Sequence, residues 1–167
     1  MTDMQPSGAL TTTGVDAITS YLQGEGVAYE LIEHEPAMSA ADEAGVAHIP
    51  PAEVAKTIVL RDQRAYVIAA VPASERLDVH KLRALLGATG KLRLASEAEI
   101  ARDIPRLEVG AAPPFGPMLP SAEVIDEDLL RHPAILCPAG DHRHSVLVDP
   151  NEIVRITAAR CADIAAD

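Results

Sequence analysis

Two neighbouring apolar runs constrain the fold of this chain most strongly. The first extends from Lys56 to Leu60 and the second from Ala65 to Val71, and only the polar segment Arg61 to Arg64 separates them. Two runs rich in β-branched residues around a short polar turn predict a β-hairpin. Because both runs are almost continuously apolar, we expect both strands to be buried on both faces, inside a sheet.

The other periodic segments alternate irregularly between helix and strand. Apolar spacing, capping residues and terminal glycines predict helices over 15–23, 39–45, 78–86, 96–103 and 150–154. Short strands are predicted over 29–32, 91–94, 123–125, 134–137 and 145–148. The proline-rich segment 105–120 predicts an ordered loop. Since strands and helices follow no regular βαβ order, the sequence predicts an α+β fold.

Composition limits how the core is built. The chain has 167 residues, 48% of them hydrophobic, but only three Tyr, one Phe and no Trp. We therefore expect one domain with a core of Ala, Val, Leu and Ile. The cysteines, Cys137 and Cys161, lie far apart in the sequence and indicate neither a disulfide framework nor a zinc site.

The two ends of the chain differ from its middle. We expect a disordered tail over 1–13, a folded domain over 14–157 and a C-terminal tail over 158–167. The first segment lacks the basic and long apolar stretches of a signal peptide. No apolar run approaches the ~18 residues that a membrane span needs. These features favour a cytoplasmic protein without a membrane partner.

The charge of the chain is unevenly distributed. The formal net charge is −11, which argues against tight, sequence-independent binding to DNA or another nucleic-acid backbone. Residues 1–50 contain no Lys or Arg, whereas the segment from Arg76 to Arg93 has an excess of cations over its one acid, Asp78. Two interpretations stay open for this segment: a site for a phosphate-bearing partner, or a solvated helix face and strand edge.

The common catalytic signatures are missing. The chain has no GxSxG, GxxxxGK, GxGxxG or HExxH segment, which are the patterns of serine hydrolases, phosphate-binding loops, dinucleotide sites and zinc proteases. His142 and His144 form an HxH pair that could bind a metal ion, but without a nearby third ligand two edge-strand histidines are the simpler interpretation. No metal and no cofactor is predicted.

Two features stand above this background. Lys56 begins an apolar strand, where its ammonium must stay in water, be paired, or meet a ligand anion. The segment Gly110 to Gly116 combines two prolines with two glycines, so a rigid loop could direct backbone groups at a ligand. Each has a plain structural alternative: a strand-end lysine that reaches solvent, and a structural turn.

Five segments together resemble the YbaK/EbsC family of aminoacyl-tRNA deacylases, which includes the editing domain inserted in bacterial-type prolyl-tRNA synthetases. The resemblance extends from about Tyr21 to Ile156. The segments that carry it are Tyr29 to Pro36, Ala55 to Leu60, Gly110 to Gly116, Val124 to Glu127 and Ala139 to His142.

The resemblance implies a mixed, barrel-like sheet flanked by helices, and hydrolysis of the ester between an amino acid and the terminal adenosine of tRNA. Lys56 matches the family's essential cation, which holds the phosphate–ribose end, and is the expected catalytic residue. The loop from Gly110 to Pro114 matches the one that holds the aminoacyl carbonyl through backbone groups. The expected substrate-binding residues are Gly110, Ala111, Pro114, Phe115, Gly116, His34, Thr57, Gly140 and His142.

The expected chemistry needs few catalytic groups. An aminoacyl ester is already activated, so positioning and oxyanion support suffice. Water, a ribose hydroxyl or a substrate thiol could be the nucleophile. The expected substrate is a small amino acid such as Cys or Ala on the tRNA for proline or a similar tRNA. A synthetase is a possible partner besides the acceptor end of aminoacyl-tRNA.

The chain also departs from the family pattern. Ile104 to Leu107 stands where many members have Thr-Gly, and Cys137-Pro138 stands where a polar residue often lines the pocket. The specificity therefore stays open, and so do two other functions. One is a non-catalytic module that binds aminoacyl-tRNA or a synthetase. The other is Schiff-base chemistry of Lys56 on a small carbonyl compound.

Overall fold

The computed structural model describes residues 14–63, 65–87, 90–115 and 121–167. Its α-helices are α2 (Gly14–Gly24), α3 (Ala40–Ala47), α4 (Val79–Leu86), α5 (Glu97–Asp103) and α6 (Pro150–Thr157), with short 3-10 helices η1 (Pro51–Glu53) and η3 (Glu127–Arg131). The strands are β1 (Tyr29–Glu33), β2 (Ala55–Arg61), β3 (Tyr66–Pro72), β4 (Arg93–Leu94), β5 (Ser121–Asp126), β6 (Ile135–Pro138), β7 (His144–Val148) and β8 (Arg160–Ala162). The mixed α+β class is confirmed. The expected tail over 1–13 lies outside the described residues.

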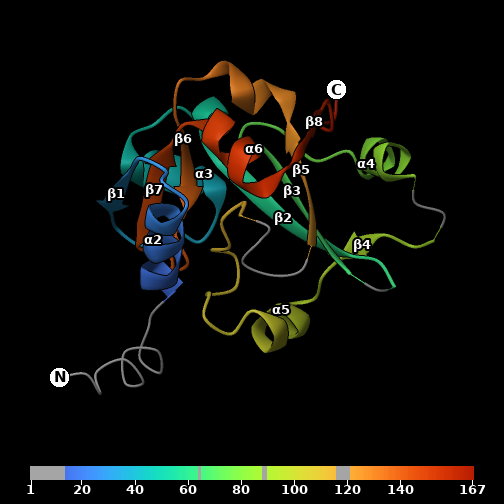
Figure 1. Cartoon of the computed structure of the whole chain (residues 1–167), viewed down its shortest axis with the longest axis horizontal. Helices are drawn as coiled ribbons and strands as arrows, with labels where there is room; N and C mark the ends of the chain where they lie inside the picture. Colours follow the sequence, from blue (N-terminus) through green and yellow to red (C-terminus); the bar gives the residue numbers. More distant parts are fainter. Residues whose placement is uncertain (1–13, 64, 88–89, 116–120) are drawn as a thin grey trace.

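The strands form two open sheets. One has the order β1-β7-β6 and the other β4-β2-β3-β5-β8. Strands β2 and β3 form the predicted antiparallel hairpin, with Lys56 opposite Val71. An isolated bridge between Val54 and Leu136 links the start of β2 to β6. The two sheets therefore meet beside α3, as Figure 1 shows, but neither closes on itself, so the expected barrel-like shape is only loosely realised.

Local signals explain most helix ends. Asp78 caps α4 by accepting the backbone N–H groups of His80 and Lys81, and Ser96 and Glu99 form the predicted capping box of α5. Helix α3 differs from the prediction, because it continues past Gly45 and ends at His48, whose φ of 58° is left-handed. Gly45 is tolerated inside this helix, and the helix ends where His48 adopts the left-handed conformation.

Burial differs between the two hairpin strands. Strand β3 is buried along its whole length, as predicted. Strand β2 is only partly buried, because β4 pairs with Leu60 and Arg61 alone. Beyond the bridge at Val54, the first half of β2 pairs with β3 alone among the described residues, which leaves room there for an opening.

The C-terminal segment is more ordered than the sequence indicates. Although the sequence predicts no element there, strand β8 adds to β5 in parallel. Ile164 and Ala165 behind it are buried. Both donate their backbone N–H groups to Oδ1 of the buried Asp126. This pairing is long-range, so no local periodicity announces it.

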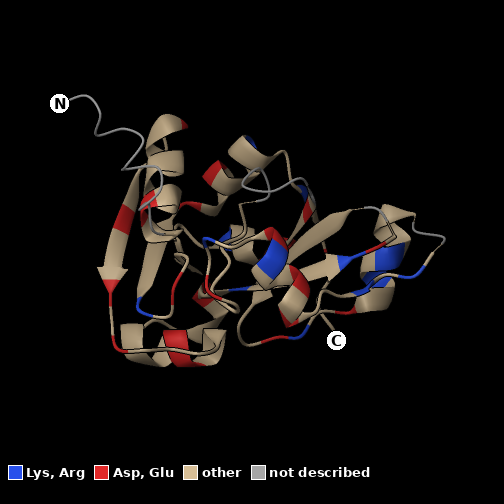
Figure 2. Ribbon diagram, turned by 90° about the horizontal axis from the view of Figure 1, so that it is seen from below, with Lys and Arg blue, Asp and Glu red and all other residues tan. Residues whose placement is uncertain are grey.

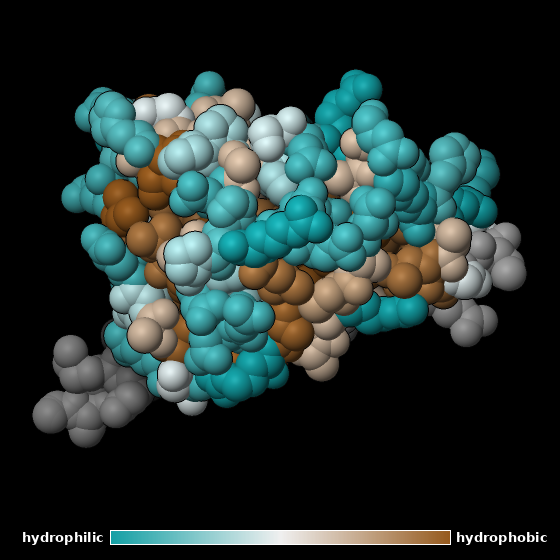
Figure 3. Space-filling model, turned by 90° about the horizontal axis from the view of Figure 1, so that it is seen from above, coloured by the Kyte–Doolittle hydropathy of each residue, from teal (hydrophilic) through white to brown (hydrophobic). Residues whose placement is uncertain are grey.

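The surface is mainly polar. On the face in Figure 3 hydrophilic residues surround smaller hydrophobic areas, and the exposed large hydrophobic side chains among the described residues are Leu31, Met38 and Leu94. None of the described helices has the length and apolar character needed to cross a bilayer.

Candidate functional site

A pocket opens where the two sheets meet α3. The start of β2, the end of β6, β7 and the loop around Gly110 all contribute to its wall. Its cavity volume is about 50 Å³, room for roughly three to five water molecules. The polar residues that line it are His34, Ser39, Glu43, Lys56, Thr57, Asp141, His142, His144 and Ser145.

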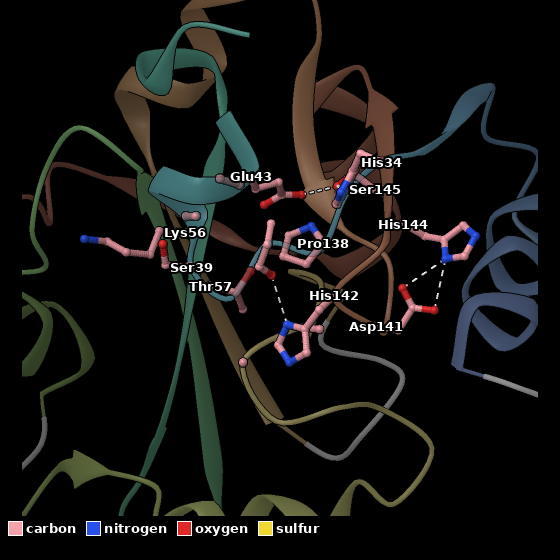
Figure 4. Close-up of a pocket in the computed structure, with 15 residues that line it drawn as sticks. His34, Ser39, Glu43, Lys56, Thr57, Pro138, Asp141, His142, His144 and Ser145 are labelled. Carbon is pink, nitrogen blue, oxygen red and sulfur yellow. Dashed lines mark hydrogen bonds and ion pairs between the residues drawn. The ribbon is translucent and has the colours of Figure 1, made fainter. Parts of the chain in front are cut away.

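Strand β2 contributes Lys56 and Thr57. Both are partly exposed. No ion pair joins the Lys56 ammonium to another described residue, and Figure 4 shows it pointing away from the histidines of the pocket. Thr57 Oγ1 is buried without a hydrogen-bond partner among the described residues. The pocket thus has a cation at its margin and an unsatisfied hydroxyl in its wall.

The loop at Gly110 packs against His142 in the pocket wall. Gly110 has a φ of 89°, and a Cβ there would lie 3.5 Å from Cε1 of His142. This φ favours glycine. His142 is held in turn, because its Nδ1 lies 3.1 Å from the carbonyl of Ala37 and its backbone N–H donates to Glu108 at 2.9 Å. Backbone and ring therefore form a fixed wall.

A second group in the pocket comes from three distant segments. Glu43 of α3 accepts the hydroxyl of Ser145 on β7, and Nε2 of His34 lies 2.8 Å from the same hydroxyl oxygen. Ser145 is fully buried and Glu43 is 4% exposed. Burial raises the pKa of Glu43 to about 7, although the Ser145 hydrogen bond opposes the shift. The sequence indicated only His34, because nothing local marks a pair 102 positions apart.

The two histidines of the HxH pair have different partners. His142 packs against the loop, whereas Nδ1 of His144 lies 2.9 Å from Asp141. Burial alone would raise the pKa of Asp141, but the Arg143 N–H and the His144 ring lower it overall. In the part of the chain that the structure describes, no three His, Cys, Asp or Glu residues are grouped to hold a metal ion.

The expected substrate-binding residues separate into three sets. His34, Thr57, Gly110, Ala111 and His142 line the pocket together with Lys56. Phe115 is instead fully buried in the main core, with its ring 6.0 Å from that of Tyr21. Pro114 is also buried and outside the pocket wall. Gly116 lies outside the described residues.

Gly140 has a packing role in this structure. Its φ is 97°, and a Cβ would approach the backbone of Gly14 in α2 to 2.9 Å. Its N–H donates to Ala111 and its carbonyl accepts from Glu108. Gly140 therefore positions the loop that forms the pocket wall, rather than lining the pocket itself.

The predicted basic segment lies far from the pocket. Figure 2 shows Lys and Arg gathered at α4 and acidic residues on β1 and α3 at the other end. Two of the cations are engaged: Lys81 pairs with Asp163 and Asp167, and Arg93 pairs with Glu99. These ion pairs favour the structural interpretation for Lys81 and Arg93.

Comparison with known proteins points to one class. A structure described as that of a proposed trans-editing enzyme for prolyl-tRNA synthetase matches with a TM-score of 0.81 and 25% identity, over 92% of this chain and 98% of that one. A scaffold protein from a study of computational epitope grafting matches with a TM-score of 0.82 and 24% identity, over 93% and 99%. A protein described as hypothetical matches with a TM-score of 0.79 and 24% identity, over 89% and 99%. No curated protein matches the chain.

The chain thus shares its fold with a structure described as that of a proposed trans-editing enzyme. The family model of the aminoacyl-tRNA editing domain matches residues 34–156. The chain belongs to this family, which confirms the membership indicated by the sequence.

Proposed function

We propose that the protein is a trans-editing hydrolase that deacylates mischarged aminoacyl-tRNA. The observation that carries this proposal is that Lys56 and the Gly110 loop line the same pocket. These are the two parts that ester hydrolysis on an acceptor end requires: a cation for the phosphate–ribose group, and a rigid backbone cradle for the carbonyl.

The direction of Lys56 suits a contact outside the aminoacyl pocket. Its ammonium points away from the pocket histidines, so it would meet a phosphate or ribose of the acceptor end while the amino acid enters the cavity. The nucleophile would be water or a group of the substrate. Cys137 is no candidate, because it is fully buried and burial raises the pKa of its thiol.

The cavity favours a small amino acid. A volume of about 50 Å³ suits a group such as an alanyl or cysteinyl moiety, on the tRNA for proline or a similar tRNA. Because one methylene is worth only ~1–3 kcal/mol of discrimination, neighbouring small amino acids should also be accepted. With a net charge of −11, we expect weak binding to tRNA, focused on the acceptor end and sensitive to salt.

A panel of mischarged tRNAs tests the proposal. The wild-type protein should release at least one small amino acid, and Lys56→Ala should abolish that release. Lys91→Ala is the matched control, since Lys91 is exposed and outside the pocket wall. Equal turnover by Lys56→Ala and the wild type would reject the proposal.

A second function is binding without hydrolysis. It is favoured by Pro138, an apolar residue in the pocket wall where many family members have a polar one. Such a module would bind aminoacyl-tRNA or a synthetase. Tight binding with no release of any amino acid across the same panel would identify it.

A further inference from the structure

The pocket contains a chain of hydrogen bonds with an unusual balance of donors and acceptors. Ser145 Oγ lies between the carboxyl of Glu43 and Nε2 of His34. At the other side of the ring, Nδ1 of His34 lies 2.7 Å from the carbonyl of Glu35. A carbonyl oxygen only accepts, so Nδ1 must carry a hydrogen.

One further proton, shared by Glu43 and His34, completes the remaining hydrogen bonds in two alternative ways. If Glu43 is ionised, the Ser145 hydroxyl donates to it and a protonated His34 donates from Nε2 to Oγ. If Glu43 is protonated, it donates to Oγ, and the hydroxyl donates to Nε2 of a neutral His34. Without that proton, Oγ of the buried Ser145 and Nε2 of His34 would face each other at 2.8 Å with lone pairs only, which is unfavourable.

The two arrangements differ by a balanced proton shift. The proton on Oε2 of Glu43 moves to Oγ of Ser145 as the Oγ proton moves to Nε2 of His34. The total charge of the three residues stays zero, while a negative charge appears on Glu43 and a positive charge on His34. Burial raises the pKa of Glu43 to about 7, which removes the usual strong preference of a carboxyl group for its ionised form at neutral pH.

Glu43 has bonding capacity left over. The only hydrogen bond of its carboxyl group among the described residues is the one from Ser145, although the residue is 4% exposed and lines the pocket. Figure 4 shows its second oxygen directed into the space enclosed by the labelled residues. This oxygen, Oε1, is not among the buried atoms that lack a hydrogen-bond partner, so it is reachable from the cavity and can accept a hydrogen bond from a ligand that donates one.

We propose that Glu43 binds the α-amino group of the aminoacyl substrate, and that Ser145 and His34 adjust the charge of Glu43 to it. This inference rests on the proposed function and adds a specificity-determining residue to it. An ammonium group at the open oxygen would favour the ionised carboxylate, and the displaced proton would pass through Ser145 to His34.

No other charged group in the pocket wall replaces Glu43 in this task. Besides Glu43 and its partner His34, the titratable residues that line it are Lys56, Asp141, His142 and His144. The carboxylate of Asp141 already contacts Nδ1 of His144, and the positive charge of Lys56 would repel an ammonium group. Behind the wall lies the thiol of Cys137, whose pKa is raised by burial first and by the nearby Glu43 second.

Two non-hydrolysable probes test the inference without any turnover. One is adenosine with alanine attached through a 3′-amide, and the other is the same compound with a propionyl group, which lacks only the amine. The wild-type protein should bind the alanyl probe on the order of tenfold more tightly, as one charge-assisted hydrogen bond predicts. Glu43→Gln should bind both probes about equally. Glu30→Gln, which removes one negative charge from an exposed position on β1, should keep the preference.

Each outcome has a distinct meaning. Equal binding of both probes by the wild type, or an undiminished preference in Glu43→Gln, overturns the inference and leaves the proposed function standing. Binding of neither probe by the wild type contradicts the proposed function and the inference with it. Gln keeps the size of Glu and one acceptor oxygen, so we expect the variant to fold.

A spectroscopic measurement checks the proton sharing separately. In ¹⁵N NMR spectra, addition of the alanyl probe near pH 7 should shift Nε2 of His34 toward its protonated position, and the propionyl probe should not. Ser145→Ala removes the bridge, so the shift should disappear there. A shift of the same size in Ser145→Ala, or none in the wild type, would overturn the relay.

Discussion

The pocket and the C-terminal clasp use the same residue types in opposite ways. We define the clasp as Lys81 and Asp126 with the chain end that they hold. Asp126 is 1% exposed, and it accepts the N–H groups of Asp128, Ile164 and Ala165. In the pocket, the carboxyl group of Glu43, which is also buried, has one hydroxyl partner among the described residues.

The two lysines repeat this contrast. Nζ of Lys81 contacts Asp163 at 3.1 Å, the carbonyl of Ala165 at 2.8 Å and Asp167 at 3.1 Å. All three donors of its ammonium are thus used. Lys56 has no ion pair within the described part of the chain. The comparison teaches that the type and burial of a charged residue do not reveal its task, whereas unused bonding capacity beside a cavity does.

The largest effect should come from replacing each of the two lysines separately. Lys56→Ala should reduce deacylation by roughly a thousandfold, a loss of about 4 kcal/mol of transition-state stabilisation, with an unchanged melting temperature. Lys81→Ala should lower the melting temperature and leave turnover near the wild-type rate. Single-turnover assays and calorimetry on both variants measure this. If Lys81→Ala lost activity as strongly while still folded, the contrast between pocket and clasp would fail.

The second-largest effect should be a difference in stability between variants of the two buried carboxyl groups, Asp126 and Glu43. Asp126→Ala leaves three backbone N–H groups without their acceptor and should cost on the order of 3 kcal/mol of unfolding free energy. Glu43→Gln keeps one hydrogen bond and removes a buried charge, so we expect a change below about 1 kcal/mol. Urea denaturation compares the two variants, and a larger loss in Glu43→Gln would make Glu43 the structural residue.

The backbone of the pocket offers a smaller test. Gly110→Ala places a side chain at a φ of 89°, which should cost about 1 kcal/mol of stability. The displaced loop should slow deacylation roughly tenfold. Gly24→Ala is the matched control, because a Cβ there meets no atom within 4 Å. Normal turnover in a folded Gly110→Ala variant would show that the loop needs no fixed backbone position.

Helix α5 should show the smallest effect, at acidic pH. Arg93 holds the pKa of Glu99 well below its usual value, with help from the Ser96 N–H. Arg102 does the same for Asp103. A lowered pKa stabilises the folded state above the unfolded-state pKa, and this contribution is lost as the pH falls. Hydrogen exchange should therefore show α5 loosening at low pH before the main core, and Glu99→Gln should weaken that pH dependence.

Much of the local structure could be predicted from the sequence. The hairpin β2–β3 follows from two apolar runs around a polar turn, and the capping box of α5 follows from Ser96 and Glu99. Lys56 and Gly110 stood out because lysine is scarce in this chain and because two prolines between two glycines stiffen a loop. Each of these signals depends on residues close together in the chain, where backbone preferences and short hydrogen bonds act.

The tertiary structure alone decided which distant groups became partners. It placed Ser145 between Glu43 and His34, took Phe115 and Gly140 into packing contacts, and paired the chain end with β5 and Asp126. These contacts form because burial forces every polar group to find whatever partner the folded chain brings near, and sequence separation sets no pattern for that choice. The sequence by itself determined most of the elements and the family, whereas folding added β8 and determined which carboxyl group was left with an open oxygen.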